Sequence, residues 1–287
     1  MEEKLMVRFL MSALLSSVIS IRALKRKSLD RSGAMAGFLV MLIHLSSGFR
    51  FGALLLAFFF SSSKLTRLGE ERKRNIDDDF KEGGQRNWIQ VLANSGIASI
   101  LVITVVANGG QDKCLDTKES TLITGLIGGI IGHYACCNGD TWSSELGTLS
   151  KSQPRLITTF KKVQKGTNGG ITIDGTLASA AAGLLIGLTY LLVGFLTTDC
   201  ASDVALKQLL VLPLAAAAGL LGSLIDSLLG ATLQFSGFCT VQKKVVGRKA
   251  PTVKKISGLD ILDNNGVNAV SVLLTTVLTA IACVYIF

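Results

Sequence analysis

Acidic side chains stand inside or at the ends of long apolar stretches of this 287-residue chain. Asp226 has apolar sequence on both sides, Asp140 and Glu145 follow one apolar stretch, and Asp174 opens another. An ionisable group at membrane depth is costly to bury, so it marks a candidate functional position. These four residues are therefore where we expect chemistry.

Oxygen-bearing side chains of this kind suit a hard divalent cation. Mg²⁺ prefers carboxylate, amide and water oxygens and is commonly bound together with substrate phosphates. The predicted magnesium ligands are Asp140, Asp174, Asp226 and Asn265. The predicted catalytic residues are Asp140, Glu145 and Asp226.

Lysines and a glycine-rich loop follow Asp140 and Glu145 along the chain. Lysine supplies positive charge and glycine-rich backbone exposes N–H groups, and both can bind phosphate oxygens. The predicted phosphate- or nucleotide-binding residues are Lys161, Lys162, Lys165, Asn168, Gly169 and Gly170. Phosphoryl transfer needs neutralised charge and in-line positioning more than covalent help from the protein. We therefore predict a nucleotide and a lipid with a phosphate head group as substrates.

Each acidic candidate also has a purely structural interpretation. Asp30 and Asp174 could serve only as helix N-caps, because their side chains accept hydrogen bonds from unpaired backbone N–H groups. Asp226 could be a buried hydrogen-bonding residue without a catalytic role, and Glu145 could face water beyond the end of a helix. The sequence leaves these alternatives open.

A short polar phrase stands at the start of four apolar stretches and must help to position the candidates. Its copies lie at Leu29–Gly33, Leu92–Gly96, Ile173–Thr176 and Leu262–Gly266. Asp, Asn, Ser and Thr before an apolar run are typical of helix N-termini. The spacing indicates a parallel repeat of helical hairpins that enter and leave the membrane on one face.

Composition indicates an integral membrane protein. The chain is 49% hydrophobic and only 17% charged, with a mean hydropathy of +0.50. Most apolar stretches approach the ~20 residues that cross a bilayer. They lie at about 5–21, 33–48, 50–63, 88–107, 121–138, 172–196, 206–230 and 266–287. We predict an all-α, multi-pass helical bundle of about eight spans, with seven or nine possible, forming a single domain over 1–287.

Lysine and arginine fall mainly on one side of this arrangement. With eight spans, 23 of the 29 Lys and Arg residues share a side. By the positive-inside rule this side is cytoplasmic, with loops at about 64–87, 139–171 and 231–265, and both termini face out. The net charge of +9 thus describes a one-sided basic surface. Without an aromatic–basic RNA motif or zinc finger, we expect membrane lipids and no nucleic acid as partners.

Small residues and cysteines add two further expectations. Gly125/Gly129, Gly128/Gly132 and Gly183/Gly187 have the small-xxx-small spacing that lets membrane helices approach closely. Cys114 and Cys200 fall in the two longer outer loops. They could pair in an oxidising compartment or remain free thiols.

Several segments are distinctive in combination. They are Lys27–Ala34, Ser63–Arg67, Asn138–Gly147, Asn168–Gly170, Asp174–Thr176, Asp226–Gln234 and Asp263–Asn268. Together they resemble the transmembrane protein 19 family over essentially the whole chain. That family includes a plant chloroplast kinase of phytyl phosphate and a plant plasma-membrane protein linked to glucose-responsive growth.

The resemblance implies one of two functions. The first is prenyl-phosphate kinase activity, carried by Asp140, Glu145, Asp174, Asp226 and Asn265. The alternative is a non-enzymatic plasma-membrane protein in glucose-responsive growth, signalling or transport. The outer halves of the spans carry few ionisable groups, which favours a one-sided site over a transport route. The start of the chain lacks an Arg/Ser-rich leader, so we expect the plasma membrane, or an endomembrane, rather than a plastid.

Overall fold

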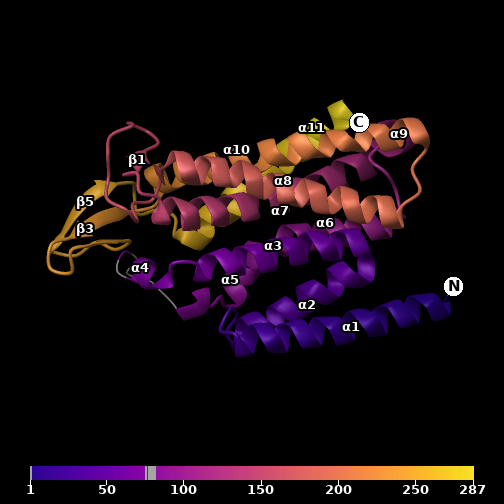
Figure 1. Cartoon of the computed structure of the whole chain (residues 1–287), viewed down its shortest axis with the longest axis horizontal. Helices are drawn as coiled ribbons and strands as arrows, with labels where there is room; N and C mark the ends of the chain where they lie inside the picture. The colour runs from indigo at the N-terminus through magenta and orange to yellow at the C-terminus, as the bar shows by residue number, and fades with distance from the viewer. Residues whose placement is uncertain (1, 75, 77–81) are drawn as a thin grey trace.

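The computed structural model describes all residues except 1, 75 and 77–81, and helices cover all eight predicted apolar segments (Figure 1). Seven of these segments each contain one long helix, and the segment at 88–107 contains two shorter ones. The helices are α1 Glu2–Lys25, α2 Arg31–Ser47, α3 Phe49–Arg67, α5 Trp88–Ala93, α6 Gly96–Ala107, α7 Thr117–Leu149, α8 Ile173–Thr197, α10 Val211–Leu233 and α11 Asn264–Ile286. The predicted all-α membrane architecture is confirmed.

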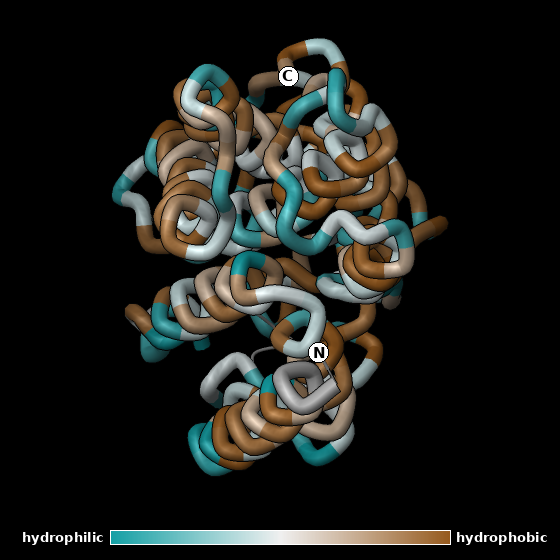
Figure 2. The backbone as a smooth tube through the Cα atoms, turned by 90° about the vertical axis from the view of Figure 1, so that its right-hand side faces the viewer, coloured by the Kyte–Doolittle hydropathy of each residue, from teal (hydrophilic) through white to brown (hydrophobic). Residues whose placement is uncertain are grey.

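The outside of the bundle is apolar, as a bilayer requires. Within the described residues, five helical stretches are long and apolar enough to span a membrane, and they contain α1, α7, α8, α10 and α11. Large apolar side chains are exposed along α1, α8 and α11. Figure 2 shows hydrophobic colour along the helices and hydrophilic colour gathered on connecting segments. Exposed apolar side chains over whole helices indicate contact with lipid rather than water.

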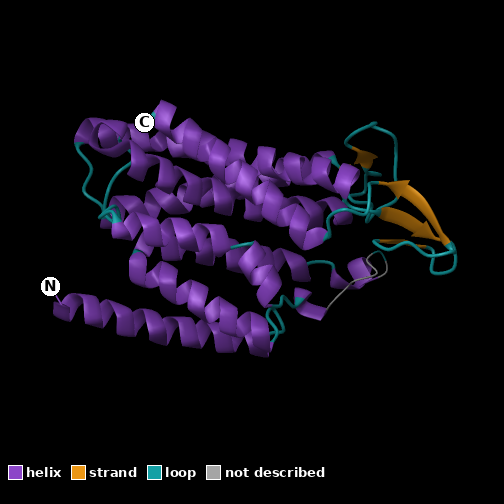
Figure 3. Ribbon diagram, turned by 180° about the vertical axis from the view of Figure 1, so that it is seen from behind, coloured by secondary structure: helices purple, strands orange, loops and turns teal. Residues whose placement is uncertain are grey.

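Small sheets gather at one end of the bundle, which we call the basic end (Figure 3). Strand β1 Arg155–Leu156 pairs with β2 Gly170–Ile171, and β3 Ser236–Cys239 lies between β4 Lys244–Val246 and β5 Val253–Ser257. All these pairings are antiparallel. The strands therefore lie in the predicted loops 139–171 and 231–265.

Short helices complete both ends of the molecule. Helix α4 Glu70–Arg74 and the 3₁₀ turn η1 Glu82–Gly84 follow α3, whereas α9 Ser202–Lys207 and the 3₁₀ turn η2 Gln208–Leu210 lead into α10. Figure 1 places α9 and both chain termini at the end opposite the strands, which we call the terminal end. Both termini thus share one side of the bundle, as the sequence predicts.

Helix α7 forms the centre of the bundle and packs against α3, α6, α8, α10 and α11. Small residues make these contacts close. A Cβ atom added at Gly139 of α7 would lie 2.5 Å from the carbonyl oxygen of Gly219 in α10. Gly128 and Gly132 lie against Cys283 and Thr279 of α11 in the same way. The predicted role of small residues in helix contact is confirmed.

The end of α7 differs from the prediction. The fifth span was expected to stop at residue 138, but the helix continues to Leu149, so Asp140 and Glu145 lie on helix rather than in a loop. Neighbouring α8 supports this extension, because a Cβ atom at Gly175 would lie 2.8 Å from the carbonyl oxygen of Ser143. Tertiary packing, which no local pattern records, prolongs the helix.

The polar phrases cap helices in two of four cases. Asp30 and Asp263 accept a hydrogen bond from the backbone N–H groups of Gly33 and Gly266, at 2.7 and 2.8 Å. Asn94 instead ends α5, so its prediction as an N-cap was wrong. The reason is a break in the helix at Asn94, whose carbonyl accepts a hydrogen bond from Nε2 of His133 in α7 at 2.9 Å.

Asp174 is not a cap either. Thr172 caps α8 by accepting a hydrogen bond from the N–H of Gly175, and Asp174 stands in the first turn. A carboxylate in this position still interacts favourably with the positive end of the helix dipole.

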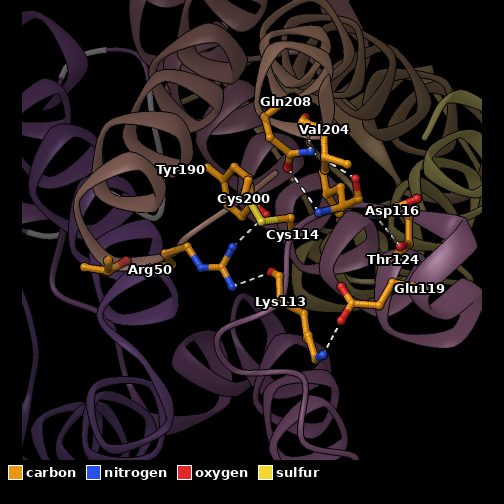
Figure 4. Close-up of a disulfide and its surroundings, with 12 residues drawn as sticks. Arg50, Lys113, Cys114, Asp116, Glu119, Thr124, Tyr190, Cys200, Val204 and Gln208 are labelled. Carbon is orange, nitrogen blue, oxygen red and sulfur yellow. Dashed lines mark hydrogen bonds and ion pairs between the residues drawn. A yellow bond between two sulfur atoms is a disulfide. The ribbon is translucent and has the colours of Figure 1, made fainter. Parts of the chain in front are cut away.

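A disulfide joins Cys114 to Cys200 at the terminal end (Figure 4). Next to it, buried Arg50 donates hydrogen bonds to the hydroxyl of Tyr190 at 3.0 Å and to the carbonyls of Gln111 and Lys113. The pairing settles the alternative that the sequence left open. It ties the start of α7 to the connection between α8 and α9.

Candidate functional site

Asp140 of α7 and Asp226 of α10 meet at the basic end of the bundle. Both side chains line the same cavity, and they lie close enough for each carboxyl group to act on the other electrostatically. Asp226 Oδ2 also accepts a hydrogen bond from the hydroxyl of Ser271 in α11 at 2.9 Å. With its amide nitrogen facing Asp226, Asn268 donates to the same oxygen at 3.2 Å. Two neighbouring carboxylates repel each other when both are ionised, so a bound proton or cation would stabilise the pair.

A cavity of about 340 Å³ opens beside this pair. Eight of the predicted site residues line it. They are Asp140, Glu145, Lys165, Asn168, Gly169, Gly170, Asp226 and Asn265. The structure therefore brings together residues of α7, α10, α11 and the loop between β1 and β2.

Three other predicted residues lie outside the lining. Lys161 and Lys162 are exposed to solvent near β1, away from the cavity walls. Asp174 accepts a hydrogen bond from the hydroxyl of Ser150 at 2.5 Å, at the junction of α7 and the following loop. Its carboxylate thus holds the end of α7 in place.

The glycine-rich loop is held firmly against α10. The N–H of Asn168 donates to Ser236 Oγ at 3.0 Å, and its side-chain amide donates to the carbonyl of Phe235 at 3.2 Å. Gly169 has φ of 75°, and a Cβ atom there would lie 2.5 Å from that of Ala231. Because the N–H of Gly170 donates to the carbonyl of Thr167, the loop has already used several of its donors.

Two lysines near the cavity donate hydrogen bonds to backbone carbonyls at the C-terminal ends of helices. Lys165 donates to the carbonyls of Thr148 and Ser150 at the end of α7. Lys73 of α4 donates to the carbonyls of Leu65 and Thr66 at the end of α3. A cation at a helix C-terminus is stabilised by the negative end of the dipole.

Lys73 also neutralises Glu145. The ammonium and the carboxylate form an ion pair of 2.5 Å, and both side chains are largely buried. Glu145 borders the cavity, but as one half of this pair. The pairing makes it a poor candidate for a free general base.

Sequence reasoning missed a half-buried arginine and a fully buried asparagine near the site. Arg86 lines the cavity wall beside α5. Asn138 is fully buried two residues before the predicted Asp140, and it joins α3 to α7 and α8. Gly83 and Gly84 ahead of Arg86 mark a turn, which is the signal that could have drawn attention to this segment.

The donor set at the cavity fits magnesium in part. Among the side chains that the structure describes, no group of three or more His, Cys, Asp or Glu residues is arranged to hold a metal ion. Magnesium, however, is often bound by one or two carboxylates, with water and substrate phosphates completing its shell. Asp140 and Asp226 supply that minimum, and the side-chain amides of Asn265 and Asn268 line the same cavity.

A family comparison now adds to this geometry. Residues 14–276 match the model of the family described as integral membrane protein DUF92. The chain belongs to this family of integral membrane proteins. The predicted family resemblance is thereby confirmed.

Relatives range from plants to archaea. The chain is 68% identical to Protein PGR of Arabidopsis thaliana over 288 residues, covering all of both chains. It is 35% identical to an uncharacterised membrane protein of Methanocaldococcus jannaschii, over 81% of this chain and 86% of the relative. It is 24% identical to Protein VTE6, chloroplastic, of Arabidopsis thaliana, over 72% of this chain and 56% of the relative. No solved structure matches the chain.

Proposed function

We propose that this DUF92 protein transfers a phosphoryl group from a nucleoside triphosphate to a prenyl phosphate or a related lipid phosphate. The observation that carries the proposal is the convergence of Asp140 and Asp226 on one polar cavity at the basic end of the bundle. The distant similarity to VTE6, together with the kinase activity of the family member considered above, supports the same chemistry.

The chemistry suits the residues present. An oxygen of the lipid phosphate forms a bond to the γ-phosphorus while the bond from that phosphorus to the β–γ bridging oxygen breaks. The nucleoside diphosphate leaves with the electron pair, and the lipid monophosphate becomes a diphosphate. A phosphate oxygen is already ionised near neutral pH, so this reaction needs no general base. The pairing of Glu145 with Lys73 is compatible with a reaction of this kind.

In this reaction the protein would position the phosphate groups and neutralise their negative charge. Asp140 and Asp226, with Asn265 or Asn268, are the residues that would hold magnesium. Bound magnesium would neutralise phosphate charge in the transition state. Lys165 lines the same cavity.

The test uses purified protein in lipid nanodiscs with Mg²⁺, a panel of nucleoside triphosphates and farnesyl monophosphate. We expect farnesyl diphosphate to form, and Asp140→Asn or Asp226→Asn to lower its rate by about 100-fold or more, the scale on which an electrostatic contact to the transition state acts. Asp203→Asn, an exposed change at the terminal end, is the matched control. Equal rates in the wild type and both site variants would refute the proposal.

A second function is favoured by the full-length identity to Protein PGR. It is a non-enzymatic role at the plasma membrane in glucose-responsive growth, signalling or transport. Its location would be the plasma membrane, or an endomembrane, although the VTE6 relative is chloroplastic by name. Absence of turnover with every nucleotide, together with a growth phenotype that Asp140→Asn rescues fully, would favour this second function.

A further inference from the structure

Arg86 is a cation at the cavity wall whose backbone is fixed from two sides. Its N–H donates to the carbonyl of Ser28 at 3.1 Å, and its own carbonyl accepts from the N–H of Asp30 at 3.0 Å. Gly33 of α2 packs so closely on this carbonyl that any side chain there would collide with it. Contacts with the start of α2 therefore fix the backbone position of Arg86, from which its side chain extends.

The next residue fixes the other side of this segment. Asn87 and Gln90 form a reciprocal capping box at the start of α5, with bonds of 3.0 and 3.1 Å. A rigid backbone reduces the entropy lost when a side chain engages a ligand. Arg86 is thus pre-positioned at the cavity wall.

The guanidinium of Arg86 has N–H donors that make no hydrogen bond to the described residues. Its Nη1 donates to the hydroxyl of Ser63 in α3 at 3.2 Å. Among the described residues this is its one side-chain hydrogen bond, and no described carboxylate lies in salt-bridge range. A guanidinium carries five N–H donors, so several remain for a ligand in the cavity.

Neighbouring charges leave Arg86 without a dedicated counter-ion. Burial lowers the pKa of its guanidinium, and the negative charge of Glu145 acts in the opposite direction. Glu145, however, is already paired with Lys73 at 2.5 Å. Arginine stays protonated in proteins, so a positive charge persists here and an anion would stabilise it.

The phosphate-binding residues that the sequence predicted have fewer hydrogen-bond donors left than Arg86 or lie outside the cavity. Lys165 donates to two carbonyls at the end of α7, and Asn168 and Gly170 donate their N–H groups within the protein. Lys161 and Lys162 lie outside the cavity. Arg86 is thus the cavity cation with the most hydrogen-bonding capacity left among the described residues.

Helix α5 indicates which phosphate Arg86 would meet. Trp88, Ile89 and Leu92 are exposed on one face of α5, whereas Gln90 and Asn94 of the same helix line the cavity. An exposed apolar face is typical of a surface that contacts a membrane. Helix α5 therefore stands between bilayer and cavity, directly after Arg86.

We propose that Arg86 binds the phosphate group of the lipid substrate in this cavity, with Ser63 orienting its guanidinium. The planar fork of arginine matches two phosphate oxygens at once. The lipid tail would lie along the apolar face of α5 and reach the bilayer. This inference rests on the proposed function for the identity of the ligand, but binding alone can test it.

The experiment measures binding of radiolabelled farnesyl monophosphate and farnesol to the protein in phosphatidylcholine nanodiscs. We expect Arg86→Ala to weaken farnesyl monophosphate binding by about 10- to 100-fold, the range for losing a charge-assisted hydrogen bond. Arg86→Lys should retain part of the affinity, because it keeps the charge and loses the fork. Unchanged farnesol binding and an unchanged thermal midpoint would show that the variants are folded.

Arg155→Ala is the matched control, because Arg155 is an exposed arginine at the same end and does not line the cavity. It should bind both probes as the wild type does. Equal binding of farnesyl monophosphate by the wild type and Arg86→Ala would overturn the proposal, as would a wild type that prefers farnesol.

Turnover separates this inference from the proposed function. If the wild type has kinase activity, Arg86→Ala should raise KM for the lipid phosphate and leave KM for the nucleotide unchanged. A rise for the nucleotide alone would overturn the assignment. Arg86-dependent binding without any turnover would support Arg86 and refute the kinase.

Discussion

At the scale of single residues, buried polar side chains hold the region around the site together. Asn138 is fully buried beside Asp140, and its Oδ1 accepts hydrogen bonds from the hydroxyls of Ser61 and Ser62 at 2.9 and 3.0 Å. Its Nδ2 donates to the carbonyl of Ala182 at 3.1 Å. One amide thus connects α3, α7 and α8 immediately below the cavity residues.

Replacing this amide should be costly. Asn138→Leu leaves two hydroxyls without their acceptor and a carbonyl without its donor, so we expect a loss of about 1–3 kcal/mol of stability. The measurement is the thermal midpoint of detergent-purified protein. Asn108→Leu is the control, because Asn108 is exposed and bonds within its own helical turn. An equal fall of the thermal midpoint in both variants would show that the hydrogen bonds of Asn138 add no stability beyond that of an exposed asparagine.

At the scale of elements, the crossing of α7 and α10 positions the carboxyl pair. Gly139 precedes Asp140, and its missing side chain lets the helix approach the backbone of Gly219. Membrane helices pack through such small residues, since lipid offers no hydrophobic drive for their association. The distance between Asp140 and Asp226 therefore depends on a glycine contact on the same two helices.

Gly139→Ala should push these helices apart. The added methyl group meets backbone, which cannot move away as a side chain can, so we expect about 1–3 kcal/mol of destabilisation. Thermal midpoints and farnesyl monophosphate binding measure the effect, and both should fall. Gly96→Ala in α6 has no atom within 4 Å of its new Cβ and should keep or slightly raise the midpoint. A Gly139→Ala midpoint equal to that of the wild type would contradict the close-packing argument.

At the scale of the whole molecule, charge and chain ends divide the bundle into two faces. The strands and the cavity lie at the basic end, whereas both termini and the Cys114–Cys200 disulfide lie at the terminal end. Disulfides persist in oxidising compartments. The covalent pairing therefore supports the orientation that the positive-inside rule predicts, with the cavity toward the cytoplasm.

Thiol labelling can measure this orientation. We expect Lys118→Cys, at an exposed position of the terminal end, to react with a membrane-impermeant maleimide in intact cells. Gly247→Cys, at an exposed position of the basic end, should react only after permeabilisation. The four free cysteines are buried, so they provide a low background. Labelling of both positions from the same side would refute the predicted topology.

The sequence by itself determined the helices and placed both chain termini on the same side of the bundle. Apolar runs of bilayer length and caps such as Asp30 and Asp263 depend on neighbours along the chain, and these signals are local. It also identified Asp140 and Asp226 as costly ionisable groups. Only the tertiary structure decided that these two meet, that Asp174 instead holds the end of α7, and that Arg86 joins the cavity. The physical reason is that convergence of distant side chains depends on where helices cross, and the backbone contact at Gly139 and Gly219 sets that crossing.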